Sequence, residues 1–161
     1  MFKDKVLLIT GGTGSFGNAV LSHFLHTDFS EIRVFSRDEK KQEDMRLAFK
    51  SDKLKFYIGD VRDYDSVHDA LRGVDYVFHM AALRITRCAE NPREALEVMY
   101  DGTFNVVEAC VKHRVKKLVA ASSASIYGMA STFPTREDHP PYNNRTLYGA
   151  AKSFGEGLLR S

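Results

Sequence analysis

Short apolar runs alternate along the chain with longer segments in which apolar residues recur at helical spacing. The short runs are rich in Val, Ile and Phe, as buried strands are, and five of them have the length of an ordinary strand. Strands that alternate with helices in this way are typical of parallel sheets, whose crossovers carry helices on both faces. The pattern therefore predicts an α/β fold with a parallel sheet of about five strands.

The predicted strands are Lys5–Thr10, Glu31–Ser36, Leu54–Ile58, Val74–His79 and Lys116–Ser122. The predicted helices are Phe16–His26, Arg37–Lys50, Asp65–Arg72, Pro92–His113 and one from Leu147 to the end. Asp63 and the pair Asn91–Pro92 are typical helix starts. Between the last strand and the last helix, Met129–Thr146 is rich in Pro and Asn and predicts a long irregular loop, in which Tyr142 is expected to pack or anchor the chain.

A glycine-rich turn follows the first predicted strand directly. It reads Thr10-Gly11-Gly12-Thr13-Gly14-Ser15-Phe16-Gly17 and leads into a helix. The glycines at 11, 14 and 17 suit a tight turn, a close approach of backbone to a pyrophosphate and close helix–strand packing. Amides at the helix start would then bind the phosphates. Because the turn lies between a strand and a helix, we interpret it as a dinucleotide site in a Rossmann-like domain spanning 1–161, rather than as a turn without ligand.

The end of the second strand bears on the choice of cofactor. An NAD site would place an acidic side chain about twenty residues beyond the turn, whereas this chain has Ser36-Arg37-Asp38. A guanidinium group and a hydroxyl suit a 2′-phosphate, so the sequence favours NADP, with NAD as the alternative. Asp60 and Val61 would contact the adenine, unless Asp60 is only a turn residue.

A second candidate site is formed by Tyr148 and Lys152, one helical turn apart in the last predicted helix. A nearby ammonium favours the phenolate form that a base at neutral pH requires. Ser123 ends the fifth strand at the edge where such sheets bind ligands, and it could hydrogen-bond a substrate oxygen. The alternative is a solvated helix face. His79 is expected to be structural.

Composition excludes several classes of function. The net charge of +2 is spread along the chain, so nucleic acid is not an expected partner. No apolar run reaches the roughly 20 residues of a membrane span. Cys88 and Cys110 lack metal-ligand spacing and are expected to be reduced thiols of a cytoplasmic protein that begins with no signal peptide.

The chain resembles the extended short-chain dehydrogenase/reductases, the family of nucleotide-sugar epimerases and dehydratases. The resemblance rests on the glycine turn, on His79-Met80-Ala81-Ala82, on Asp101-Gly102-Thr103, on Ser122-Ser123-Ala124-Ser125-Ile126-Tyr127-Gly128, and on Tyr148 with Lys152. It implies that Gly11, Thr13, Gly14, Ser15, Phe16 and Gly17 hold the dinucleotide, with Ala81 and Ala82 beside the nicotinamide ribose. It also implies a catalytic set of Ser123, Tyr148 and Lys152, in which Lys152 also contacts that ribose, a UDP-sugar substrate and a homodimer formed through Pro92–His113 and Leu147–Arg160.

Three departures from the family pattern shape the expected function. The first sixty residues look like UDP-N-acetylglucosamine 4,6-dehydratases, but a dehydratase carries an acid followed by Glu or Lys where this chain has Ala124 and Ser125. Met99 replaces an Asn found in many relatives. Family members also continue beyond the last helix into a substrate lobe, which we expect to be absent here.

The sequence therefore favours an NADP-linked nucleotide-sugar epimerase or reductase, present as its cofactor-binding portion. Activity and inactivity of this portion alone are both open. Two alternatives remain: a UDP-N-acetylglucosamine 4,6-dehydratase, and a dinucleotide-binding fragment or subunit without catalysis.

Overall fold

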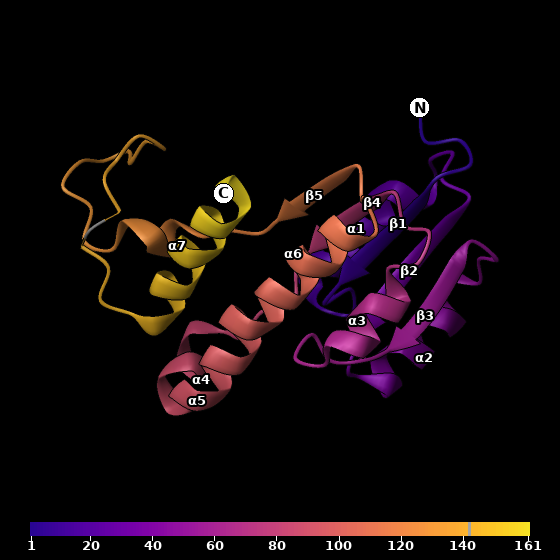
Figure 1. The fold of residues 1–161 in the computed structure, drawn as a ribbon, viewed down its shortest axis with the longest axis horizontal. Helices are drawn as coiled ribbons and strands as arrows, with labels where there is room; N and C mark the ends of the chain where they lie inside the picture. Colours follow the sequence, from indigo (N-terminus) through magenta and orange to yellow (C-terminus); the bar gives the residue numbers. More distant parts are fainter. Residues whose placement is uncertain (142) are drawn as a thin grey trace. The chain divides into compact units, whose positions relative to one another are not determined.

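Five parallel strands form one sheet in the computed structural model, which describes residues 1–141 and 143–161. The strands are β1 (Val6–Thr10), β2 (Glu31–Ser36), β3 (Leu54–Ile58), β4 (Tyr76–His79) and β5 (Lys117–Ala120), in the order β3-β2-β1-β4-β5 (Figure 1). Tyr142 lies outside the described residues. The predicted parallel sheet of five strands is confirmed, and the chain order reverses beside β1, where open α/β sheets bind their ligands.

Three strands are shorter than predicted. The strand expected from Val74 begins at Tyr76, because the Val74 amide closes a turn by donating to Leu71 O (3.1 Å). The strand expected over Lys116–Ser122 pairs only from Lys117 to Ala120. The first strand begins one residue late, at Val6.

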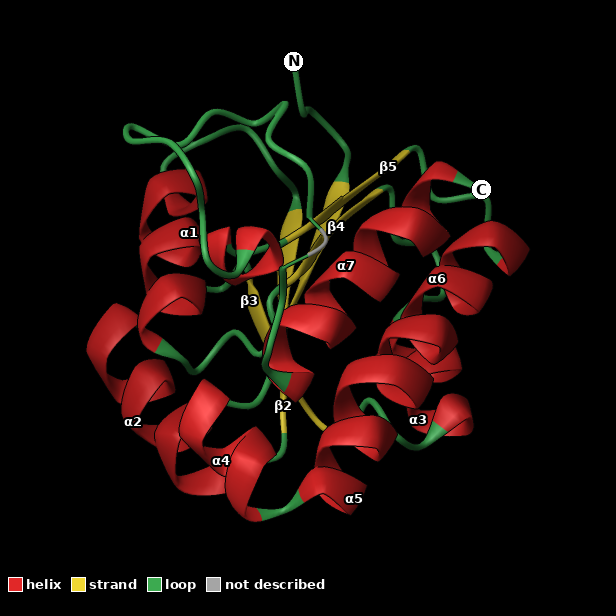
Figure 2. Cartoon of the chain, turned by 90° about the vertical axis from the view of Figure 1, so that its left-hand side faces the viewer, coloured by secondary structure: helices red, strands yellow, loops and turns green. Residues whose placement is uncertain are grey.

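The chain divides into two compact units, and the first contains the sheet. This unit comprises Met1–Ala81 and Asn105–Ala121. Its helices are α1 (Ser15–Leu25), α2 (Glu39–Phe49), α3 (Tyr64–Ala70) and most of α6 (Gly102–Lys112). Figure 2 shows α1 and α2 on one side of the sheet and α3 and α6 on the other, as the sequence predicts.

The core of the first unit is built around β1, in which Leu7, Leu8 and Ile9 are almost completely buried. Leu7 and Ile9 of this strand belong to one buried cluster with Leu21 of α1 and Ile32 of the neighbouring strand β2. Burial of each large aliphatic side chain contributes about 1.5–3 kcal/mol, so the central strand supplies much of the stability that holds the sheet together.

Capping residues set the ends of the helices. Asp38 accepts a hydrogen bond from the Lys41 amide (2.9 Å), so α2 begins at Glu39 and not at Arg37 as predicted. Lys50, with φ +45°, ends this helix. Asp63 caps α3 as predicted, by accepting from the amides of Asp65 and Ser66.

The second unit comprises Ala82–Phe104 and Ser122–Ser161. It contains α4 (Ile85–Glu90), α5 (Pro92–Leu96), a π-helical turn η1 (Glu97–Asp101), the first turn of α6, a 3₁₀ turn η2 (Ala124–Tyr127) and α7 (Leu147–Arg160). The predicted helix over Pro92–His113 is thus divided by a π turn, and α7 is confirmed. Helix α4 was not predicted, because it is short and its N-cap, Arg84, makes no side-chain cap.

No helix of the described residues is long and apolar enough to cross a membrane. Within the same residues, no group of His, Cys, Asp or Glu is arranged to hold a metal ion. Cys88 and Cys110 are free, buried thiols, as the sequence predicts.

Candidate functional site

The glycine turn of the first unit leaves β1 in a conformation that suits glycine. Gly11 has φ +65°, and its amide donates to Phe35 O (2.9 Å) on the neighbouring strand. A Cβ at Gly11 would lie 2.7 Å from the amide nitrogen of Ala81. The turn therefore has no room for a side chain at this position.

The same turn packs directly on the start of α1. A Cβ at Gly17 would lie 2.6 Å from both Gly11 O and the Cα of Gly12, so only glycine allows this approach. Gly14, exposed and extended, is the N-cap of α1, and no side chain caps the helix. No acidic residue occurs in its first turn, and Phe16 is 61% exposed. An uncapped, solvent-facing helix start next to tightly packed glycines fits a phosphate group.

Thr13 and Ser36 are joined beside this turn. Their hydroxyl oxygens lie 2.7 Å apart, and Ser36 Oγ also accepts from the Asp38 amide (3.3 Å). The sequence predicts both residues at the cofactor site, and the structure brings them together from the glycine turn and the end of β2.

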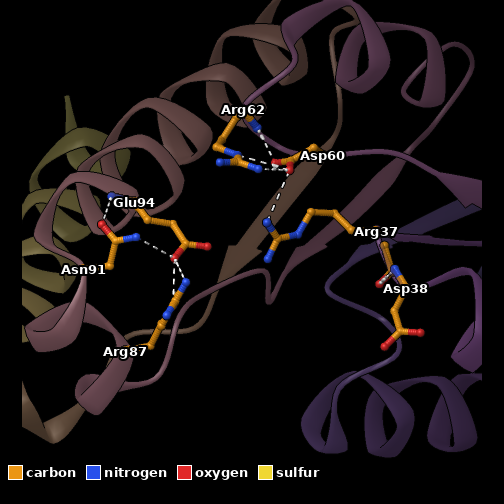
Figure 3. A network of polar contacts seen from close by, with 8 residues as sticks. Arg37, Asp38, Asp60, Arg62, Arg87, Asn91 and Glu94 are labelled. Carbon is orange, nitrogen blue, oxygen red and sulfur yellow. Dashed lines mark hydrogen bonds and ion pairs between the residues drawn. The ribbon is translucent and has the colours of Figure 1, made fainter.

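Asp60 lies between two guanidinium groups at the end of β3 (Figure 3). Its Oδ2 accepts from Arg62 Nη2 (2.7 Å) and Nε (3.1 Å), while its Oδ1 accepts from the Arg62 amide (3.0 Å). Arg37 Nη1 lies 3.4 Å from the same Oδ2. Sequence reasoning missed Arg62, because nothing in the pattern of the chain indicates that its side chain turns back onto Asp60.

The charges of this cluster determine its chemistry. Burial alone would raise the pKa of the Asp60 carboxyl, but the hydrogen bonds from Arg62 and the charge of Arg37 lower it. The carboxylate is therefore ionised at neutral pH and is paired with the guanidinium groups of Arg62 and Arg37. The Arg37 side chain is 49% exposed, so it can meet an anionic ligand from the solvent side. Val61, predicted to face the adenine, is 5% exposed, and its carbonyl accepts from Asn105 Nδ2 (2.9 Å).

The Thr10 hydroxyl connects the ends of β1 and β4. Thr10 Oγ1 accepts from the amides of Met80 and Ala81 (3.2 Å each) and lies 2.7 Å from His79 Nδ1. The Met80 amide also donates to Thr10 O (3.1 Å), so the backbone and the side chain of Thr10 together hold the end of β4. His79 is 5% exposed and structural, as predicted. Ala81 ends the first unit, and Ala82 begins the second, where it is exposed.

In the second unit, Tyr148 and Lys152 lie one turn apart on α7. The Nζ atom of Lys152 is 5.8 Å from the centroid of the Tyr148 ring. Burial lowers the pKa of Lys152, against a smaller opposite effect of Cys88. Tyr148 packs against a buried cluster that includes Cys88 and Ala151. The helix therefore holds the two predicted side chains together on its partly buried face.

Ser123 is the N-cap of η2. Its Oγ accepts from the Ser125 amide and donates to Ser125 Oγ, both at 3.1 Å. The sequence predicts that this hydroxyl shares its proton with Tyr148; in the structure its recorded partner is Ser125. Ser125 belongs to the motif of the family resemblance, but the sequence does not indicate its contact with Ser123.

Gly149 brings η2 against the start of α7. A Cβ at Gly149 would lie 2.6 Å from Ser125 O and 2.5 Å from Asn144 Nδ2. Thr146 caps α7 by accepting from the Gly149 amide (3.0 Å). Ser123 and Tyr148 therefore belong to two elements that touch at this glycine, which the sequence did not single out.

Met99 occupies a buried position within η1. Its Sδ accepts a hydrogen bond from the Leu83 amide (3.3 Å), and its carbonyl accepts from Thr103 Oγ1 (2.7 Å). The thioether thus takes one of the backbone contacts that an Asn side chain could make here.

Residues 7–130 match the model of a family described as polysaccharide biosynthesis protein. Among curated proteins, the UDP-glucose 4-epimerase of Rickettsia canadensis is 58% identical over 128 residues, which make up 76% of this chain and 38% of that protein.

Solved structures show the same fold. Pen from Bacillus thuringiensis is 37% identical, with a TM-score of 0.84 over 98% of this chain and 44% of that one. The UDP-glucose 4-epimerase of Bifidobacterium longum, solved in complex with NAD+ and UDP, is 26% identical, with a TM-score of 0.86 over 97% and 48%. This chain spans less than half the length of each of these proteins.

Proposed function

Because the chain belongs to the polysaccharide biosynthesis protein family of extended short-chain dehydrogenase/reductases, we propose that it binds a nicotinamide dinucleotide and carries the catalytic residues of a nucleotide-sugar epimerase or reductase. The substrate would be a UDP-sugar, as in the name of the Rickettsia relative. We also propose that residues 1–161 make up a dinucleotide-binding domain that is incomplete relative to the family.

One observation carries this proposal: the uncapped start of α1 beside the packed glycines. A Cβ at Gly11 or Gly17 would meet backbone atoms within 2.7 Å, and no side chain competes with a ligand for the first amides of the helix. These amides and the positive end of the helix dipole would bind the pyrophosphate, with Gly14, Ser15 and Phe16 in the first turn.

We propose NADP rather than NAD as the preferred cofactor. Arg37 would bind the 2′-phosphate, and the joined hydroxyls of Thr13 and Ser36 would add hydrogen bonds. The exposed guanidinium group of Arg37, held by a single contact of 3.4 Å to Asp60, supports this preference. Asp60 and Val61 would contact the adenine, and Ala81 and Ala82 would line the ribose side.

In the proposed chemistry, Tyr148 takes the proton of a sugar hydroxyl and later returns it. Lys152 would favour the phenolate and bind the nicotinamide ribose, and Ser123 would orient the sugar oxygen by a hydrogen bond. A bound nicotinamide supplies the acceptance and return of hydride. Burial lowers the pKa of Lys152, and perturbed pKa values of this kind cluster at functional sites.

At the two positions after Ser123, the sequence lacks the acid–base pair that a 4,6-dehydratase uses for its elimination. Ala124 and Ser125 follow Ser123, and neither side chain is ionisable near neutral pH. We therefore expect no 4-keto-6-deoxy product. The other alternative is a dinucleotide-binding module without catalysis, which would bind the cofactor but would not convert a UDP-sugar.

The decisive experiment mixes the protein with NADP(H) or NAD(H) and a panel of UDP-sugars, and follows sugar interconversion and cofactor binding separately. Interconversion that is lost in Tyr148→Phe supports the enzyme. Binding without turnover supports the module, and the absence of binding to either dinucleotide contradicts both.

We further propose a cytoplasmic homodimer. The two buried free thiols are consistent with a reducing compartment. In the second unit, Leu96, Phe104 and Phe154 each expose more than a third of their surface. These residues lie on the predicted dimer helices Pro92–His113 and Leu147–Arg160, and a partner copy would cover them.

A further inference from the structure

Asp60 holds its two arginine neighbours very unequally. Arg62 makes three hydrogen bonds to the carboxylate, two of them from the guanidinium group at 2.7 and 3.1 Å. Arg37 makes one contact at 3.4 Å, and its side chain is 49% exposed. Arg62 is thus firmly bound, while Arg37 is held by a single long ion pair of the kind that contributes little at a protein surface.

The weak pair gives Arg37 two possible partners. Without a 2′-phosphate nearby, the guanidinium group of Arg37 remains next to the Asp60 carboxylate, which serves as its counter-charge. When a phosphate is present, a bidentate pair with it is stronger than the long contact to Asp60. Because Arg62 keeps the Asp60 carboxylate satisfied, Arg37 can leave without stranding a charge on Asp60.

We propose that Asp60 is a specificity-determining residue, whose carboxylate competes with the 2′-phosphate of the cofactor for Arg37 and so lets the site accept dinucleotides with or without that phosphate. This inference rests on the proposed function and refines its cofactor preference. It also separates two roles of Asp60. A contact with adenine affects both cofactors equally and cancels in their affinity ratio, whereas competition for Arg37 changes the ratio.

The test compares two small probes, adenosine 2′,5′-bisphosphate and adenosine 5′-monophosphate, by titration calorimetry. Both carry the adenine, and only the first carries the 2′-phosphate. The measured quantity is the ratio of their dissociation constants in the wild type, Asp60→Asn, Arg37→Ala and the double variant. Asp44→Asn, which removes an exposed carboxylate from its pair with Lys40 on α2, is the matched control.

Competition predicts that Asp60→Asn raises the preference for the bisphosphate by about two- to fivefold, the range of an exposed ion pair. Arg37→Ala lowers the preference. When Arg37 is already Ala, Asp60→Asn changes the logarithm of the ratio of dissociation constants by less than half as much as it does in the wild type. Asp44→Asn leaves the ratio unchanged.

Two results overturn the inference while leaving the proposed function intact. If Asp60→Asn changes the ratio equally in the wild type and in Arg37→Ala, the carboxylate acts only by its electrostatic repulsion of the phosphate and not through Arg37. A reduced preference would mean that Asp60 positions Arg37 for the phosphate. If the wild type binds neither the probes nor the dinucleotides, the proposed function fails as well.

Discussion

A Cβ at Gly149 would lie 2.6 Å from the carbonyl oxygen of Ser125, so the start of α7 and the turn η2 meet without a side chain between them. Ser123 caps η2, and Tyr148 immediately precedes Gly149. The spacing of two predicted catalytic elements therefore depends on one hydrogen atom in place of a methyl group.

Substitution of Gly149 by Ala should destabilise the protein. The new methyl group would push against backbone and against the Asn144 amide, and overpacking of this kind costs about 1–3 kcal/mol. Gly157→Ala in the same helix is the matched control, because no atom of the described residues beyond the neighbouring backbone of α7 itself lies within 4 Å of its added Cβ. The control should gain up to about 1 kcal/mol in the free energy of unfolding, measured by urea titration. Equal effects at the two positions would contradict the close contact.

A second prediction separates ligand binding from stability at the start of α1. Ser15→Asp places a negative charge in the first turn, where it should stabilise the helix by about 0.3–1 kcal/mol. The same charge should repel a pyrophosphate and weaken dinucleotide binding at least about tenfold. Thermal unfolding and fluorescence titration measure the two effects, with Ser15→Asn as the uncharged control. Unchanged binding would remove the helix start from the cofactor site.

Lys152 should make the stability of the protein depend on pH. Burial lowers its pKa in the folded state, so the unfolded chain, with a lysine pKa of about 10.4, binds more protons between the two values. The contribution of Lys152 to stability is therefore least favourable at neutral pH and improves as the pH rises towards 10. Lys152→Met removes the titrating group and should be more stable than the wild type near pH 7.

The comparison between these two proteins is the measurement, because other buried groups act in the opposite direction. Burial raises the pKa of Cys88 and raises that of Cys110 to about 12, so both destabilise the folded state at high pH. The effect of Cys110 depends on burial alone and cancels in the difference between the wild type and Lys152→Met. The charge of Lys152 lowers the pKa of Cys88, so Cys88 adds a smaller part to that difference. If the difference in the free energy of unfolding between the two proteins is the same at pH 7 and pH 10, the pKa of Lys152 is not lowered in the folded state.

The sequence predicted the elements whose causes are local. Glycines at fixed spacing after β1 indicated the turn, and Asp63 and Asn91 marked helix starts correctly, because a cap acts within three residues. The contacts of Arg62 with Asp60 and of Ser125 with Ser123 were not predicted. Each depends on which rotamer a polar side chain adopts once its neighbours are in place. Gly149 was missed because its importance arises from Ser125, far away in the sequence.

The proposed dimer gives a further prediction. Phe104→Asp puts a charge on an apolar side chain that is 48% exposed, and it should shift the protein from dimer to monomer at micromolar concentration. Leu47→Asp is the control, since Leu47 is 61% exposed on α2, outside the proposed interface. Sedimentation velocity measures the change. A wild-type monomer at these concentrations would refute the homodimer.

The Thr10 hydroxyl also fixes the register of the two central strands. Thr10 is paired with His79 in the β1–β4 ladder, and the one oxygen serves the imidazole and the amides of Met80 and Ala81. If β4 slipped by one residue, these groups would lose that shared partner, at about 1–3 kcal/mol for each polar group left unsatisfied. The loss of these hydrogen bonds therefore disfavours the slipped register, in addition to the exposure of apolar side chains that the slip would cause. As a result, the backbone that follows β4 leaves the sheet at a fixed place beside the glycine turn.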